Sequence, residues 1–353
     1  MNELSFEAPS GQLTVLVGPS GCGKTTSLRM VNRLIRPSSG VIRLGGESTA
    51  NMDEAALRRR IGYVIQHAGL FPHRTILDNV ATTARLNGKN RKEARAIAQE
   101  LIERVGLPHA FGARYPWQLS GGQQQRVGVA RALASDPQFM LMDEPFSAVD
   151  PVVRTQLQDE FLRLQREIGK TIIMVTHDID EALKLGDQVA VLRTGGQLAQ
   201  IASPQELLRQ PANAFVADFI GRDRGYRSLG FEALGSELTV GPEPTVTLGC
   251  APATARSQAR GRWLLVVDNL NRPLGWVEPA ELAGPVRTED LNLSGTIATV
   301  SGTLRQLLDA VLSSPARRGP VVGLDGALLG TLSGEQVIGL IDGRPADPMR
   351  RSA

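Results

Sequence analysis

Apolar residues in the first half of the chain follow two patterns, one with helical spacing and one of short continuous runs. The helical spacing predicts a helix over residues 91–105, which Gly106 closes, and a long amphipathic helix over residues 152–168. The continuous runs predict buried strands at residues 13–17, 41–44, 61–65, 139–142 and 171–175. Buried strands separated by helices are typical of a mainly parallel sheet covered on both faces. The pattern therefore predicts an α/β fold.

A glycine-rich stretch connects the first predicted strand to a helix predicted over residues 26–34, which Pro37 prevents from continuing. Residues 18–25 fit the phosphate-binding pattern G-x-x-x-x-G-K-[ST] at every fixed position. Backbone N–H groups and the helix dipole would face a polyphosphate, Lys24 would reach its β- and γ-phosphates, and the Thr25 hydroxyl would bind Mg²⁺. The residues predicted to bind the nucleotide are Gly18, Pro19, Ser20, Gly21, Cys22, Gly23, Lys24, Thr25 and Thr26.

Polar residues follow three of the predicted strands. Gln66 follows residues 61–65, Asp143 and Glu144 follow residues 139–142, and His177 comes soon after residues 171–175. Ligands of parallel sheets bind at the carboxyl ends of the strands, so these side chains are expected to meet there. Asp143 would complete the Mg²⁺ shell opposite Thr25, Glu144 would polarise the attacking water, and His177 and Gln66 would contact that water or the metal. Singly, an acidic pair after a strand is often a helix cap, and a lone histidine is usually structural.

A second predicted phosphate-binding segment favours the functional interpretation of these residues over the structural one. Residues 119–123, Leu-Ser-Gly-Gly-Gln, open a helix predicted over residues 123–134, and a helix N-terminus binds phosphate. One chain does not need two cradles for one nucleotide, whereas two chains arranged head to tail do. The residues predicted to contact the partner's nucleotide are Ser120, Gly121, Gly122 and Gln123.

In this order the segments resemble the motifs of the ATPase subunit of ABC transporters, namely Walker A, Q-loop, signature, Walker B, D-loop and switch histidine. The D-loop is matched by residues 147–150, which end in Asp150. The resemblance covers roughly the first two-thirds of the chain and implies an ABC-type P-loop NTPase, a mainly parallel sheet with a helical subdomain, that hydrolyses ATP with Mg²⁺. The residues implied are Glu144, His177 and Gln66 for catalysis and Thr25, Gln66 and Asp143 for the metal.

The resemblance also implies partners. Two such subunits, as a homodimer or heterodimer, would close on two ATP molecules and open after hydrolysis. This closure would drive transmembrane permease subunits through grooves near Gln66, at the cytoplasmic face of the cell membrane, and a substrate-binding protein would be linked only indirectly. The formal net charge of +3 gives no case for nucleic acid as a partner.

Three finer segments, residues 69–73, 114–118 and 218–224, are similar to ATPases of osmoprotectant importers for glycine betaine, choline and carnitine. The alternative is an ATPase that serves an importer of another solute, such as a sugar, amino acid or polyamine, with a purely structural C-terminal domain. A sugar-importer ATPase would carry an all-β domain after residue 225. A DNA-repair ATPase would need a long coiled coil between residues 66 and 119, which are too close for it. A non-enzymatic regulator would most simply lack Glu144 or His177.

A repeat follows the predicted ATPase domain, with an offset of 55 residues. Leu265-Val266-Val267 matches Pro320-Val321-Val322, and Leu274-Gly275-Trp276-Val277 matches Leu329-Gly330-Thr331-Leu332. Each copy is predicted as strand, turn, strand and helix, with the helices at residues 279–282 and 334–341, and a further helix over residues 303–312 precedes the second copy. The first copy is expected to be irregular between residues 242 and 261, because Pro242 and Pro244 interrupt regular elements.

The repeat resembles a tandem pair of CBS modules, small α+β units that osmoprotectant ATPases often carry. The predicted domains are an ABC ATPase at 1–225, a degenerate CBS-like module at 226–285, a CBS-like module at 286–345 and a tail at 346–353. Two interpretations stay open, a decayed repeat kept for dimer contacts and a sensor of ionic strength or of an adenine nucleotide.

Composition adds three expectations. Cys22 and Cys250 lie far apart without a metal-binding spacing, which suits a reducing compartment. No apolar run approaches the ~20 residues of a membrane span, and no signal peptide is visible, so any membrane role is expected to come through a partner. Related subunits stack adenine on an aromatic residue upstream of the position of Phe6, and Phe6 itself is expected to be a core residue on a strand.

Overall fold

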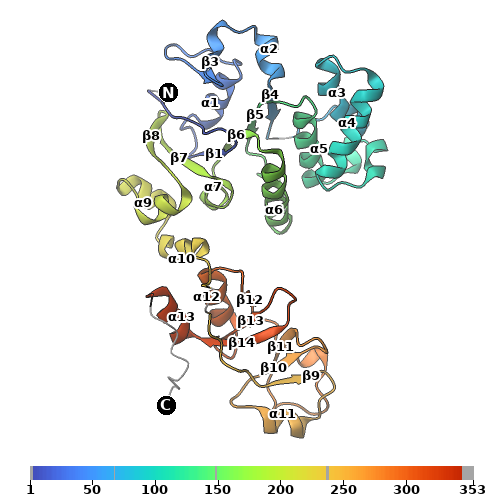
Figure 1. The fold of residues 1–353 in the computed structure, drawn as a ribbon, viewed down its shortest axis with the longest axis vertical. Helices are drawn as coiled ribbons and strands as arrows, with labels where there is room; N and C mark the ends of the chain where they lie inside the picture. The colour runs from blue at the N-terminus through green and yellow to red at the C-terminus, as the bar shows by residue number, and fades with distance from the viewer. Residues whose placement is uncertain (1–2, 67, 148, 236–237, 344–353) are drawn as a thin grey trace. The chain divides into compact units, whose positions relative to one another are not determined.

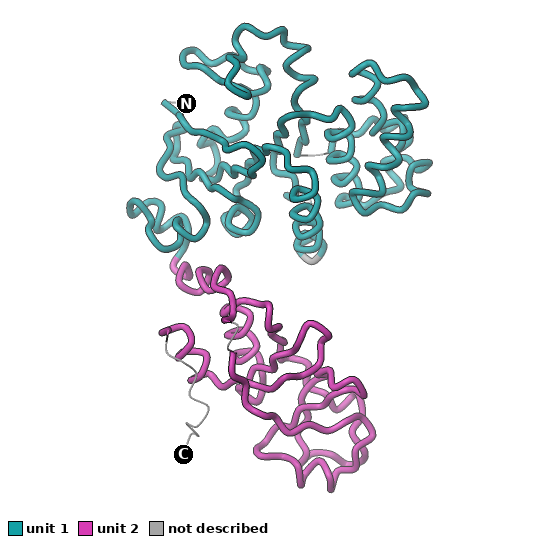
Figure 2. The backbone as a smooth tube through the Cα atoms, viewed as in Figure 1, with its two compact units in different colours: residues 1–221 teal, residues 222–353 magenta. Residues whose placement is uncertain are grey.

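The computed structural model describes residues 3–343 except 67, 148 and 236–237. The chain forms two compact units, Met1–Gly221 and Arg222–Ala353 (Figure 2). This division falls four residues before the boundary predicted after residue 225. Each unit has its own hydrophobic core and is described by itself.

A six-stranded sheet forms the centre of the first unit (Figure 1). All neighbouring strands are parallel except the last pair. In order across the sheet the strands are β4 (Ile61–Val64), β5 (Phe139–Asp143), β6 (Thr171–Thr176), β1 (Leu13–Val17), β7 (Gln188–Arg193) and β8 (Gln197–Ala202). Every residue of β1 is buried, and successive side chains of a strand point to opposite faces, so both faces of the sheet are covered there. The predicted parallel α/β sheet is confirmed.

Helices pack around this sheet, and three of them, α3, α4 and α5, form a separate layer beside its β4 edge (Figure 1). The helices predicted at 91–105 and 152–168 are confirmed as α4 and α6. Polar caps start several helices, for example Thr75 before α3 and Asn90 before α4. The helices are α1 (Lys24–Val31), α2 (Glu54–Arg59), α3 (Ile76–Leu86), α4 (Arg91–Arg104), α5 (Gly121–Leu133), α6 (Pro151–Ile168), α7 (Ile179–Leu185), α8 (Pro204–Arg209) and α9 (Ala214–Ile220).

The second unit contains the repeat as two copies of one strand pattern. In each three-stranded sheet a parallel pair is followed by an antiparallel hairpin, and the hairpins carry irregularities 55 residues apart, at Val266/Val267 and at Val321/Val322. The first copy is β9 (Thr245–Thr247), α11 (Pro252–Gln258), β10 (Leu264–Val267) and β11 (Pro273–Val277). The second is β12 (Ala298–Thr299), α12 (Leu304–Ser313), β13 (Arg318–Val322), β14 (Leu328–Ser333) and α13 (Gly334–Ile341).

Each copy pairs with the backbone segment that precedes the other copy. Gly241, ahead of the first copy, bridges Thr331 of β14, and Asn292, ahead of the second, bridges Trp276 of β11. Glycine at position 330 permits the close approach, because a Cβ there would lie 2.4 Å from the Gly241 carbonyl oxygen. The copies therefore fold as one unit.

Four predictions about local structure were wrong. Residues 279–282 form a turn and not a helix, because Gly284 and Pro285 stop the segment within six residues of Pro279. The segment 242–261 contains β9 and α11, because Pro252 occupies the first turn of its helix, where its missing N–H costs nothing. The strand predicted at 41–44 is reduced to β2 (Arg43–Leu44), paired with β3 (Glu47–Ser48). Phe6 packs against the core but lies outside any strand.

No helix in the described ranges is both long enough and apolar enough to cross a membrane.

Candidate nucleotide-binding site

The loop after β1 wraps around a lysine ammonium. Lys24 is buried, and its Nζ donates to the carbonyl oxygens of Gly18 at 2.8 Å and Pro19 at 3.1 Å. A Cβ at Gly18 would lie 2.4 Å from the carbonyl oxygen of Leu192 in β7, so the loop can lie this close to the sheet only with glycine there. Gly23 has φ 101°, in the region that favours glycine, and α1 begins at the next residue. The loop thus presents a cation and the start of a helix at the carboxyl end of β1.

The end of β5 lies beside this loop. The Thr25 hydroxyl donates to Asp143 Oδ1 at 2.9 Å. Burial raises the pKa of Asp143, and the neighbouring Glu144 adds to this, while Thr25, Arg29 and Tyr63 oppose the shift. Burial and the Asp143 charge likewise raise the pKa of Tyr63. A buried carboxylate that is costly to ionise is stabilised by a cation beside it.

These donors suit Mg²⁺ in particular. No cluster of three or more His, Cys, Asp or Glu side chains able to hold a metal occurs in the part of the chain that the structure describes. Mg²⁺ prefers oxygen ligands and usually takes only one or two from carboxylates, filling its other positions with water and phosphate. One carboxylate and one hydroxyl next to a phosphate loop fit that requirement.

Three strand ends meet at Glu144. Its Oε1 lies 3.2 Å from His177 Nδ1, and its Oε2 accepts a hydrogen bond from Gln66 Nε2 at 3.1 Å. Glu144 has φ 45°, an uncommon conformation for a residue with a side chain, and its N–H donates to the carbonyl of Val175 at 3.0 Å. The predicted meeting of Gln66, Glu144 and His177 is therefore present. The His177 side chain is largely exposed, whereas that of Glu144 is mostly buried.

The second predicted cradle, residues 120–123, starts α5. Ser120 accepts from the N–H of Gln123, and Gln123 Oε1 accepts from the N–H of Ser120 at 3.0 Å, which fixes the first turn. Gly122 fits tightly against α6, because a Cβ there would lie 3.1 Å from Leu157. Among the described residues no hydrogen bond or ion pair joins residues 120–123 to residues 18–26. The structure thus does not bring the two cradles of one chain together.

The segment predicted as the D-loop precedes α6. Asp150 is exposed, and Ala148 lies outside the described residues. Arg154, which the sequence analysis missed, connects this segment to the turn that carries His177. Its Nη2 donates to the Val149 carbonyl at 3.1 Å, and its Nη1 lies 3.8 Å from Asp178. One arginine on a polar helix gives no signal in the sequence, since its role depends on a contact across 24 residues.

A further network that sequence reasoning missed fastens the chain after Gln66. Arg131 of α5 donates to the carbonyls of Ala68 and Gly69, each at 2.7 Å, and burial lowers the pKa of its guanidinium. The buried Asn79 of α3 accepts from the N–H of Phe71 at 2.7 Å and donates to that residue's carbonyl. The segment that follows Gln66 is therefore held by the helical layer, while Gln66 itself binds Glu144 of the sheet.

Together the parallel sheet, the phosphate loop and the polar groups at the strand ends define a P-loop ATPase. The description "ABC transporter" belongs to the family model that matches residues 1–147. The chain is 44% identical to the osmoprotectant import ATP-binding protein OsmV of Salmonella typhimurium over 96% of this chain and 90% of that protein. It is 42% identical to the glycine betaine/carnitine/choline transport ATP-binding protein OpuCA of Bacillus subtilis, over 87% of this chain and 84% of that one.

Solved structures agree with this class. The dimeric ATP-binding cassette MJ0796 bound to ADP and Pi is 33% identical, with a TM-score of 0.51, over 56% of this chain and 88% of that one. CbiO1 of Clostridium perfringens, part of an ABC transporter complex, is 28% identical with a TM-score of 0.55, over 59% of this chain and 83% of that one. The chain belongs to the family of ABC transporter ATP-binding proteins, and it is an ATPase associated with transport.

Proposed function

We propose that this chain is the ATP-hydrolysing subunit of an ABC importer for quaternary amine osmoprotectants such as glycine betaine, choline or carnitine. The observation that carries the chemistry is the convergence of Gln66, Glu144 and His177 beside the Thr25–Asp143 pair. Hydrolysis of a nucleoside triphosphate requires a base, a polar group that contacts the water or the metal, and a pair of metal ligands, all beside the phosphate loop.

The proposed roles follow from this arrangement. Residues 18–26 bind the phosphates, with the Lys24 ammonium turning from the loop carbonyls to the β- and γ-phosphates. Thr25, Asp143 and Gln66 hold Mg²⁺, which when bound neutralises charge on the phosphates. Glu144 accepts the proton of the attacking water, and His177 keeps the Glu144 carboxylate oriented.

Assembly is the second part of the proposal. Residues 120–123 form a cradle separate from residues 18–26, so we place the cradle of one chain on the nucleotide of a second chain, most simply as a homodimer. The exposed Asp150 lies near that interface, next to α6, against which Gly122 packs. The permease subunits bind near Gln66, where Arg131 and Asn79 hold the following segment to the helical layer. This places the protein at the cytoplasmic face of the membrane, with a substrate-binding protein linked indirectly.

The substrate class rests on the relatives. The similarity to OsmV covers 96% of the chain, so it includes the second unit as well as the ATPase unit. The paired α+β copies of that unit support its assignment as a tandem CBS-like pair. They also favour osmoprotectants over a sugar, whose importers would be expected to carry an all-β unit here.

Uptake by the reconstituted transporter tests the proposal. The chain is combined with its permease and binding protein in proteoliposomes loaded with ATP, and uptake of labelled glycine betaine, choline, carnitine and maltose is compared. At least one quaternary amine should accumulate, maltose should not, and a Glu144→Gln chain should abolish uptake. Uptake of maltose alone would refute the substrate class. Quaternary amine uptake that persisted with Glu144→Gln would instead refute the catalytic assignment.

A further inference from the structure

Arg154, in the first turn of α6, joins two segments that carry proposed functional residues. Its Nη2 donates at 3.1 Å to the carbonyl of Val149, which directly precedes Asp150. Its Nη1 lies 3.8 Å from Asp178, which directly follows His177. Its Nε is enclosed and has no hydrogen-bond partner among the residues that the structure describes. Enclosing a donor without a partner costs free energy, so the other contacts of the guanidinium hold it in place against that cost.

The two carboxylate oxygens of Asp178 have separate partners. Oδ1 caps α7 by accepting from the N–H groups of Asp180 at 2.9 Å and Glu181 at 3.3 Å. Oδ2 is the oxygen that faces Arg154. An asparagine at this position can keep the cap through its amide oxygen while it removes the charge. The contact with Arg154 can therefore be separated from the start of α7.

The contacts of Arg154 complete a ring that returns to Glu144. The Glu144 carbonyl accepts from the N–H of Ser147 at 3.2 Å and from its hydroxyl at 2.9 Å, so the chain turns sharply after Glu144. Arg154 connects the end of this turn to Asp178. His177, the next residue back, lies with its Nδ1 3.2 Å from Glu144 Oε1 and closes the ring. Supporting contacts of this kind fix the orientation of the side chains that they join.

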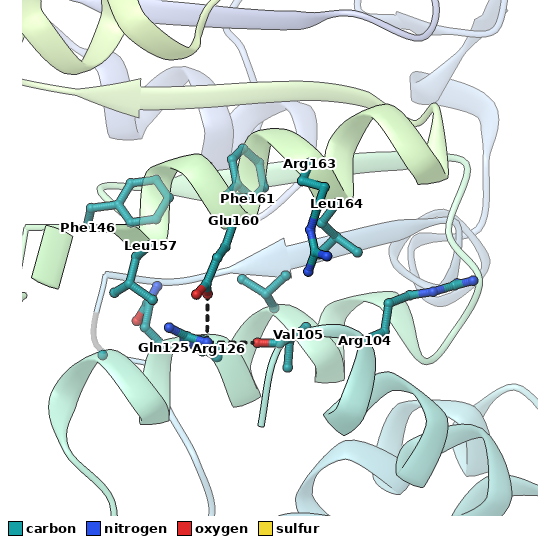
Figure 3. Close-up of a pocket in the computed structure, with 12 residues that line it drawn as sticks. Arg104, Val105, Gln125, Arg126, Phe146, Leu157, Glu160, Phe161, Arg163 and Leu164 are labelled. Carbon is teal, nitrogen blue, oxygen red and sulfur yellow. Dashed lines mark hydrogen bonds and ion pairs between the residues drawn. The ribbon is translucent and has the colours of Figure 1, made fainter. Parts of the chain in front are cut away.

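Other contacts keep α6 in place when Arg154 is changed. Toward α7, Gln158 donates to the buried Glu181 at 3.2 Å. Toward α5, Arg126 lies 2.6 Å from Glu160 (Figure 3). Arg154 and Asp178 are both partly exposed, so their ion pair adds little to stability. A change at Arg154 should therefore alter the geometry at the ends of α6 and α7 more than the stability of the fold.

We propose that Arg154 is a positioning residue for ATP hydrolysis. It holds His177 toward Glu144 and makes this orientation depend on the segment that ends in Asp150. The inference rests on the roles proposed above for Glu144 and His177, since Arg154 itself touches neither of these side chains in any contact described above.

The location of Arg154 connects this role to assembly. In the proposed dimer the exposed Asp150 lies near the partner chain. Gly122, predicted to contact the partner's nucleotide, packs close by, since a Cβ there would lie 3.6 Å from Val149. Docking of the partner would fix the Val149 carbonyl, and Arg154 would pass this constraint on to His177.

The first test compares steady-state ATP hydrolysis by the full chain and by Arg154→Met, which removes the guanidinium and keeps an unbranched side chain. The kcat should fall about tenfold, because a displaced support misplaces the groups that react. KM for ATP and binding of labelled ATP should change less than about twofold, since the phosphate loop is untouched. Arg166→Met, at an exposed position on the same helix, is the matched control and should keep the parental kcat.

A second variant isolates the contact with Asp178. Asp178→Asn should lower kcat without weakening ATP binding, and it carries the same test if Arg154→Met does not fold, which thermal unfolding shows. Combined with Arg154→Met it should slow hydrolysis no further, because both changes remove the same contact. A combined loss equal to the product of the two single losses would contradict a shared contact.

The His177→Ala background separates positioning from a structural role. His177→Ala should itself slow hydrolysis, and Arg154→Met added to it should cost less than about another twofold, because no His177 is left to position. A parental kcat for Arg154→Met, or an undiminished further loss in the His177→Ala background, would overturn the inference and leave the proposed function standing. Parental hydrolysis by His177→Ala would instead refute the proposed role of His177, and the inference with it.

Discussion

The two units both contain parallel strand pairs, but they use the carboxyl ends of those strands differently. In the ATPase unit β1, β4, β5 and β6 end in groups that meet one another, including Thr25, Gln66, Glu144 and His177. In the C-terminal unit the sheets are completed by the chain itself, since Gly241 and Asn292 pair with the outer hairpin strands. Chemistry follows from the convergence of polar groups and not from the presence of a parallel sheet.

The units also differ in how fully a buried carboxylate is paired. Glu243 is 3% exposed, and its two oxygens accept from Arg318 at 2.7 and 2.9 Å, with a third bond from Thr331 at 2.8 Å. Asp143 has Thr25 at 2.9 Å, and burial raises its pKa. The fully paired Glu243 holds a fold together, whereas the under-compensated Asp143 provides a place for a cation.

The largest effect is expected in the phosphate loop. Lys24→Ala should remove ATP binding and lower hydrolysis by about 10³-fold, because it deletes the cation that faces the phosphates. Lys170→Ala, which removes an ion pair with the exposed Asp136, is the matched control and should keep parental activity. Equilibrium binding of labelled ATP and steady-state phosphate release measure both. Tight ATP binding by Lys24→Ala would show that the ammonium is not needed.

A change in the C-terminal unit should affect stability and not chemistry. Glu243→Gln leaves Arg318 without its charge partner and should lower the free energy of unfolding of that unit by about 3 kcal/mol. Glu278→Gln, whose partner Arg262 is 69% exposed, should cost much less, because solvent screens that ion pair. Denaturant unfolding and ATPase assays check this. A loss of ATPase activity without a loss of stability would contradict the expectation that the C-terminal unit affects stability alone.

Removal of the C-terminal unit should spare ATP hydrolysis. A chain that ends after Arg227 keeps every predicted ATPase residue and should hydrolyse ATP at a rate within about twofold of the full chain. If the unit senses ionic strength or an adenine nucleotide, the reconstituted transporter should lose its threshold of activation. Transport is measured over a range of salt and nucleotide concentrations. If transport depended on salt and nucleotide in the same way with and without the unit, the unit would be a structural appendage and not a sensor.

The smallest effect concerns the buried Glu181 of α7. Burial raises the pKa of Glu181, so the folded state holds its proton more tightly than the unfolded state does. Its contribution to stability is therefore greatest at acidic pH and is lost as pH rises through the folded value. Glu181→Gln can still accept from Gln158 Nε2, as Glu181 does at 3.2 Å, and should stay within about 1 kcal/mol of the parent. The parent should lose stability relative to this variant as pH rises above the ordinary range of a glutamate pKa, and parallel pH curves would contradict the assignment.

Local patterns predicted the ATPase unit well, because continuous apolar strands and fixed motif spacings leave few alternatives. Lys24 could be singled out from the phosphate-loop pattern, and Asp143 and His177 because each follows a predicted strand. Arg154 could not be singled out, because its role depends on its contacts with Val149 and Asp178, which no sequence pattern reveals. In the second unit the prediction of a helix at 279–282 was wrong, because the five residues between Pro279 and Pro285 include Gly284 and are too few to form one. The helix α11 was missed because Pro252 can mark the start of a helix as well as a break.

We infer that a working ATPase site is composed of two chains. The most direct test is the mass of the Glu144→Gln chain in solution with and without Mg²⁺ and ATP, by sedimentation or light scattering. Because this change should stall hydrolysis while leaving binding intact, the mass should rise from 37.9 kDa to twice that value only when ATP is present. Adding Gly122→Asp to the same chain should prevent the rise while ATP still binds, since it spoils the cradle offered to the partner. A dimer that forms equally without ATP, or that survives Gly122→Asp unchanged, would contradict the composite site.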